Sequence, residues 1–273
     1  MGRISGKSPI GVGFLSEMAE EIILPKQEEL YADPELREMI DAGVFFGRKK
    51  SRTHPRMRPY ILGNRNGIEL INLVKTREDM DKALALIKEK VLSGGTVLFV
   101  GTQPPAEEVK NVAVEFSFPV VVNRWLGGTL TNSKIILGRL DYYKKLKNDL
   151  ESGAFKDKYT KKELLEIERE AKRLGELFGG LEGYSGRLDV MVVVDANLHH
   201  TAVREANKMN IPVVAFINTD TDPDDVKYGV VGNNKAKTSI NWFLGKIRTA
   251  IKEAMAARQA APPIEAVKAP ETV

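Results

Sequence analysis

The sequence predicts an α/β protein whose parallel sheet is covered by helices on both faces. Apolar runs rich in Val, Ile and Phe lack the alternation of half-exposed strands, as expected for strands buried on both faces: residues 96–100, 119–123, 190–195 and 212–218. Helical patterns alternate with these runs over residues 77–92, 105–116, 200–209 and 235–257. Such alternation of strands and helices favours parallel strands joined by helical crossovers.

The two ends of the chain differ from its middle. Residues 1–33 form an extension that begins with a glycine-rich stretch, typical of a flexible arm, and residues 14–24 are a candidate amphipathic helix. Residues 258–273 are rich in Ala and Pro and are predicted to be a disordered tail. The sheet domain is therefore assigned to residues 34–130 and 180–257.

A stretch without strand character interrupts the alternation between the second and third predicted strands. Within residues 131–179, two apolar runs have helical spacing, and the second is a heptad seam: Ile136, Leu140, Tyr143 and Leu150, then Leu164, Ile167, Ala171, Leu174 and Phe178. Thr160 and Glu163 have the spacing of a capping box. We expect an inserted helical hairpin whose tip presents lysines to solvent or to nucleic acid: Lys156, Lys158, Lys161 and Lys162.

Residues 48–58, called the basic segment below, hold six cations and no acid in eleven positions. The segment follows a short helical signal that ends at Gly43, and Pro55 restricts its backbone. Arginines on a restrained loop lose little conformational entropy when they bind phosphate oxygens, so the segment predicts a site for nucleic acid. A solvated basic loop or a localisation tract is the alternative that this charge pattern leaves open.

Composition limits the other functions that the chain can have. The 41 basic and 37 acidic residues give a net charge of only +4, so the positive charge is local. The chain has no cysteine, which excludes disulfides, thiolate catalysis and cysteine-bound metal. Its longest apolar runs have the length of strands, so no association with a membrane is expected.

Residues 123–132, called the Trp125 segment below, lie between a predicted strand and the helical hairpin. Arg124 can bind a phosphate through two hydrogen bonds. Trp125 either stacks on a base or anchors the segment in the core, and its size favours the anchor. Gly127 and Gly128 permit an unusual turn or the close approach of another backbone.

Polar residues after the third and fourth predicted strands leave an enzymatic alternative open. Doubly wound sheets bind ligands at the carboxyl ends of their strands, where a nucleotide- or metal-dependent enzyme would use Asp195 and Asp220. However, the chain has no P-loop and no Gly-x-Gly-x-x-Gly turn. His199 and His200 are adjacent, so their side chains diverge on a helix and do not easily bind one metal ion.

Three sets of residues resemble the signatures of one family. Residues 42–47, 55–61 and 65–68 resemble the N-terminal signature of the small-subunit ribosomal protein two family, universal uS-two, and residues 123–132 resemble its central signature. The third signature is similar to residues of the C-terminal half: Asp195, Glu205, Ala206, Ile211, Pro212 and residues 219–223. The resemblance extends over about residues 34–255, and the position of the hairpin is similar to the bacterial type.

The resemblance implies a flavodoxin-like doubly wound parallel sheet with an inserted α-helical coiled hairpin. It implies a structural, non-catalytic constituent of the small ribosomal subunit that acts in translation in the cytoplasm, without cofactor or metal. The implied partners are the small-subunit ribosomal RNA and neighbouring ribosomal proteins, including the large mRNA-binding protein one. The implied RNA-binding residues are Arg48, Lys49, Lys50, Arg52, His54, Arg56, Arg58, Arg124, Thr131 and Asn132. A free RNA-binding adaptor that works outside ribosomes is a further alternative.

The cations of the basic segment make the expected RNA binding strongly dependent on salt. If all six neutralise one phosphate each, the logarithm of the binding constant falls with the logarithm of salt concentration with a slope of roughly −4 to −5. Affinity then decreases on the order of a thousandfold between ~50 and ~200 mM salt.

Overall fold

A computed structural model describes residues 33–102, 105–155 and 159–260 of the chain. The predictions for the N-terminal arm, for residues 14–24, for Lys156 and Lys158 and for residues 261–273 lie outside this part. Within it, no helix combines the length and the apolar character needed to cross a membrane.

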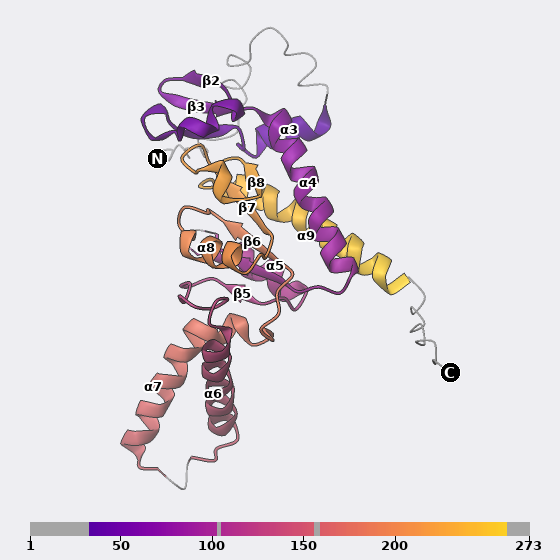
Figure 1. Cartoon of the computed structure of the whole chain (residues 1–273). Coiled ribbons are helices and arrows are strands. Elements are labelled where there is room, and N and C mark those ends of the chain that lie inside the picture. The colour runs from indigo at the N-terminus through magenta and orange to yellow at the C-terminus, as the bar shows by residue number, and fades with distance from the viewer. Residues whose placement is uncertain (1–32, 103–104, 156–158, 261–273) are drawn as a thin grey trace, which may run out of the picture.

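The core is a five-stranded parallel sheet with strand order β5-β4-β6-β7-β8 (Figure 1). Four of the strands confirm the predicted apolar runs: β4 (Val97–Val100), β5 (Val120–Val121), β6 (Val190–Val194) and β7 (Val213–Ile217). The fifth strand, β8 (Tyr228–Val231), was not predicted, because its four residues include a glycine and make a weak strand signal. All residues of β4, β6 and β7 are buried, as expected for a sheet covered on both faces.

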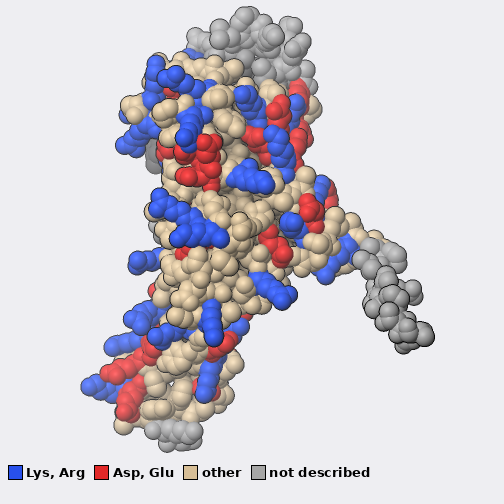
Figure 2. Space-filling model, in the orientation of Figure 1, with Lys and Arg blue, Asp and Glu red and all other residues tan. Residues whose placement is uncertain are grey.

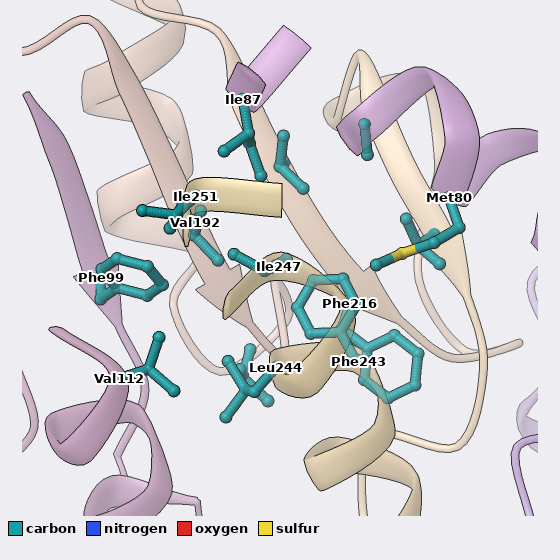
Figure 3. Packing of buried hydrophobic residues seen from close by; sticks show 14 of the residues in the cluster. Met80, Ile87, Phe99, Val112, Val192, Phe216, Phe243, Leu244, Ile247 and Ile251 are labelled. Carbon is teal, nitrogen blue, oxygen red and sulfur yellow. The ribbon is translucent and has the colours of Figure 1, made fainter. Parts of the chain in front are cut away.

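Helices cover both faces of this sheet and confirm the doubly wound class. One face packs against four helices: α3 (Pro34–Asp41), α4 (Leu73–Leu92), α5 (Ala106–Glu115) and α9 (Lys237–Ala260). The other face packs against α8 (His200–Lys208) and the base of the hairpin. Figure 3 shows the first face, where Phe99, Val192 and Phe216 of the sheet meet residues of α9. The rings of Phe216 and Phe243 stack with centroids 4.7 Å apart.

Two helix ends differ from the predicted bounds by three residues or more. α4 starts at Leu73 rather than residue 77, because the side chain of Asn72 accepts a hydrogen bond from the amide of Val74 and caps the helix. α9 continues to Ala260, three residues into the range assigned to the tail. Its Ala-rich end has high helix propensity.

The inserted hairpin consists of α6 (Ser133–Glu151) and α7 (Lys161–Phe178), and it projects from the sheet as an arm (Figure 1). Every residue of the predicted seam on α7 is buried or half-buried, and the capping box of Thr160 and Glu163 is present. On α6 the buried residues are Ile136, Leu140, Tyr143 and Leu146, whereas the predicted Leu150 is only half-buried and Lys147 pairs with Glu182. A short helical turn, η3 (Gly179–Leu181), returns the chain to the sheet.

A small antiparallel sheet, which the sequence did not predict, lies beyond β8. Its strand order is β1-β3-β2, with β1 (Phe46–Lys49), β2 (Ile61–Arg65) and β3 (Ile68–Ile71). Two helical turns, η1 (Lys50–Arg52) and η2 (Pro55–Tyr60), connect β1 to β2. The basic segment is therefore the end of a strand and two ordered turns, rather than a single loop.

Candidate nucleic-acid interface

The basic segment is fastened to the acidic loop, residues 219–225, which follows β7. The amide of Arg48 donates to the hydroxyl of Thr219 over 2.9 Å, and the amide of His54 donates to the carbonyl of Thr219 over 2.8 Å. Gly47 permits this approach, because a Cβ atom there would lie 2.9 Å from the Thr219 methyl group. Met57 is fully buried and fixes the middle of η2. The segment is thus held rigidly at the carboxyl end of the large sheet.

Carboxylates of the acidic loop neutralise two cations of the basic segment. Arg48 Nε lies 3.1 Å from Asp220 Oδ2, and both side chains are about three-quarters buried, with 26% and 23% exposed. Arg56 Nη1 lies 2.9 Å from Asp222 and 2.7 Å from Asp224. The amide of Asp224 and the guanidinium of Arg56 both favour the ionised carboxylate, so the pKa of Asp222 lies below its ordinary value. His54 faces the same carboxylate over 3.8 Å.

The other cations of the basic segment point to solvent. Four exposed side chains have no ion pair to any residue that the structure describes: Lys49, Lys50, Arg52 and Arg58. Figure 2 shows basic side chains spread over the small sheet, with a group of acidic side chains next to them. Four of the six cations of the basic segment are therefore exposed and unpaired within the described residues, and two are paired with carboxylates.

The Trp125 segment is held by the buried side chain of Glu205 on α8. Glu205 Oε1 accepts from the indole of Trp125 over 3.0 Å and from the amide of Gly128 over 2.8 Å. Oε2 accepts from the amides of Leu130 and Thr131 over 3.0 and 3.2 Å, and from the Thr131 hydroxyl over 3.2 Å. Trp125 is therefore an anchor of the segment, as its size suggested.

These hydrogen bonds keep Glu205 ionised although its side chain is buried. Burial raises the pKa of the carboxyl, but the bonds from the Trp125 indole and the three amides outweigh burial, and the pKa lies below the ordinary value of a glutamate. The family resemblance includes Glu205 in the third signature, but no role was predicted for its side chain. The available signal was its position: Glu205 shares the buried stripe of α8 with Ala202, Val203 and Ala206, where an acid needs a partner.

The predicted contact residues of the Trp125 segment differ in their surroundings. Arg124 and Asn132 are exposed, and Arg124 has no ion pair within the described ranges. Thr131 is also exposed, but its amide and hydroxyl already bind Glu205. The segment follows edge strand β5, whereas the basic segment binds the loop after β7, so the two lie near opposite edges of the sheet (Figure 1).

The side chains proposed for an enzymatic site are engaged in structural contacts. Asp195 Oδ2 lies 2.5 Å from the ammonium group of Lys235, and Oδ1 accepts from the amide of Leu198. Asp220 pairs with Arg48. His199 is buried, and burial lowers its pKa, while its ring lies 3.3 Å from the amide of Thr102. Within residues 33–102, 105–155 and 159–260, no three acidic, histidine or cysteine residues gather as a metal site would require.

Comparison with known proteins agrees with the family suggested by the motifs. The model of the family "Ribosomal protein S2" matches residues 39–254. The chain is 43% identical over 233 residues to the small ribosomal subunit protein uS2 of Corynebacterium urealyticum, covering 83% of this chain and 86% of that protein.

Relatives from two other bacteria give the same result. Identity is 39% over 227 residues with uS2 of Rhizobium meliloti, covering 83% of this chain and 88% of that protein. It is 41% over 218 residues with uS2 of Shewanella halifaxensis, covering 80% and 90%. The chain therefore belongs to the ribosomal protein S2 family.

Proposed function

We propose that this protein binds the RNA of the small ribosomal subunit through the exposed cations of its basic segment, with Arg124 and Asn132 as a second contact. It is a structural, non-catalytic constituent of the small subunit in cytoplasmic ribosomes, which is the role of its family in translation. The observation that carries the proposal is the group of four exposed cations on an ordered backbone: Lys49, Lys50, Arg52 and Arg58.

The geometry favours contacts with phosphates over reading of bases. Lysine and arginine side chains on short helical turns reach phosphate oxygens, and such contacts carry no sequence information. The indole N–H of Trp125 is bound by Glu205 and its side chain is partly buried, which supports a role as an anchor rather than as a platform for bases. We infer recognition of RNA shape through separated phosphate contacts near two edges of one rigid sheet.

The hairpin fits the role of an arm that contacts neighbouring ribosomal proteins. It consists of two helices packed on a regular seam, and its outer surface presents Ile135, Tyr142 and Leu165 to solvent. We propose that protein partners, including the large mRNA-binding protein one, bind the hairpin or the sheet domain. This division into a sheet domain and a hairpin at residues 131–179 is supported by the way the hairpin projects (Figure 1).

A sedimentation experiment tests the function. A tagged copy of the chain in cell extract is expected to sediment with small subunits in a sucrose gradient at moderate salt. The triple variant with Lys49, Lys50 and Arg52 changed to Glu should shift to the top of the gradient because it loses three phosphate contacts.

The matched control changes three exposed cations outside the hairpin and both segments, Arg37, Lys110 and Lys208, to Glu. It alters net charge equally and should still sediment with small subunits. Equal loss in both variants would contradict a specific role of the basic segment. Wild-type protein that stays at the top would instead support the free adaptor.

A further inference from the structure

Arg56 is held by two carboxylates of the acidic loop at once. Its guanidinium lies 2.9 Å from Asp222 and 2.7 Å from Asp224. A guanidinium binds a phosphate and a pair of carboxylate oxygens in the same way, through planar donors to charged oxygens. The acidic loop thus occupies one arginine of the basic segment as a phosphate would.

We propose that Asp222 and Asp224 are specificity-determining residues for RNA, because they compete with phosphate for Arg56. An RNA that meets only the exposed cations of the segment gains four contacts. An RNA that also presents a phosphate at Arg56 displaces the carboxylates and gains a fifth. This inference rests on the proposed binding of RNA by the basic segment.

The two paired arginines differ in how easily they can exchange partners. Arg56 is 59% exposed and Asp224 is 70% exposed, and ion pairs at such positions contribute little stability. Both residues line a hollow of about 750 Å³, which gives the guanidinium room to turn. Arg48, in contrast, is only 26% exposed, and its amide is bound to Thr219. Arg56 is therefore the exchangeable arginine, and Arg48 is structural.

The acidic loop offers a matched pair of variants. Asp224→Asn removes a carboxylate that binds Arg56, whereas Asp225→Asn changes the net charge equally at an exposed neighbour whose carboxylate has no ion pair in the described part of the chain. In the double variant Asp222→Asn/Asp224→Asn, the amide oxygen at 222 can still accept the hydrogen bond from the amide of residue 224 that caps the turn. Thermal melting checks that each variant folds.

Binding is measured with the full chain, using poly(U) as generic RNA and purified small-subunit ribosomal RNA as specific RNA. Asp224→Asn should raise affinity for poly(U) several-fold more than Asp225→Asn, and the preference for ribosomal RNA should fall. In the double variant the salt slope for poly(U) should steepen by about 0.7, the contribution of one phosphate contact on a single strand. In an Arg56→Gln background, Asp224→Asn and Asp225→Asn should behave alike.

The outcomes separate this inference from the proposed function. If wild-type protein binds neither RNA, the proposed function fails. If wild type binds and Asp224→Asn has no larger effect than Asp225→Asn, only the net charge matters, and competition for Arg56 is overturned. An effect of Asp224→Asn that persists in the Arg56→Gln background would overturn it as well.

Discussion

The basic segment and the Trp125 segment lie at the same end of the sheet but are held by different interactions. Ion pairs between half-buried or exposed side chains tie the basic segment to the acidic loop. A single buried carboxylate, Glu205, receives five hydrogen bonds from the Trp125 segment. Exposed ion pairs are weak and exchangeable, whereas orphaned buried donors are costly. One surface is therefore adjustable, and the other is fixed.

The largest effect should follow removal of the buried carboxylate. Glu205→Ala leaves several buried donors without a partner, and we expect a loss of about 3–5 kcal/mol in the free energy of unfolding. Glu205→Gln should lower the free energy of unfolding by less, but it should still destabilise the protein. The NH₂ group of glutamine is a donor, and it would face donors of the Trp125 segment that now bind a carboxylate oxygen. Urea unfolding followed by tryptophan fluorescence measures both. The control Glu168→Ala, at an exposed position on α7, should leave the midpoint unchanged; a loss below about 1 kcal/mol in Glu205→Ala would refute the anchor.

The second effect is the salt dependence of RNA binding. Four contacts predict a slope of about −2.8 to −3.6, so affinity should fall about 50- to 150-fold between ~50 and ~200 mM salt. All six cations would give a slope beyond −4 and a decrease of several hundredfold or more. Titration of the isolated chain with poly(U), the generic RNA, at several salt concentrations separates the two values. The steeper slope would show that RNA displaces the acidic loop from both arginines.

The large sheet was predicted well because the apolar residues of each buried strand indicate by themselves that the strand lies in the core. Continuous Val and Ile runs identify a strand covered on both faces without knowledge of its neighbours. The small sheet escaped prediction, since β1 consists of four residues, among them Gly47, Arg48 and Lys49, which have low strand propensity or high charge. Its strands are defined by their pairing with one another, and both pairings contain a register shift. Neither the pairing nor the shift is visible in one segment of sequence taken alone.

The candidate site could be predicted only in part, for the same reason. The charge of the basic segment was visible in the sequence, but its neutralisation was not, because Arg48 and Asp220 are 172 positions apart. Likewise, the size of Trp125 predicted an anchor, whereas its partner Glu205 is 80 positions away. Which residues pair across such distances depends on the fold. A single sequence shows that the two residues are present, but it does not show that they are in contact.

The third effect is the response to acid, which should distinguish the two surfaces. The folded pKa of Glu205 is depressed, so its contribution to stability is complete above the unfolded value, near 4.5, and is lost as pH falls through the folded pKa. The difference in unfolding free energy between wild type and Glu205→Gln should therefore be constant near neutrality and shrink below about pH 4.5. Urea midpoints of both proteins at several pH values measure this. A difference that is independent of pH would contradict an ionised Glu205.

The smallest effect is expected from the exposed arginine. Arg56→Gln removes ion pairs in which Arg56 and Asp224 are mostly exposed, and Asp222, which is 27% exposed, keeps the hydrogen bond from the amide of Asp224. The urea midpoint of this variant should therefore stay close to that of wild type. Arg48→Gln should be measurably less stable, because it leaves Asp220, which is about three-quarters buried, without its cation. If Arg56→Gln proves as destabilising as Arg48→Gln, both pairs are structural. The basic segment would then be as fixed as the Trp125 segment, and its arginine could not be exchanged between carboxylate and phosphate.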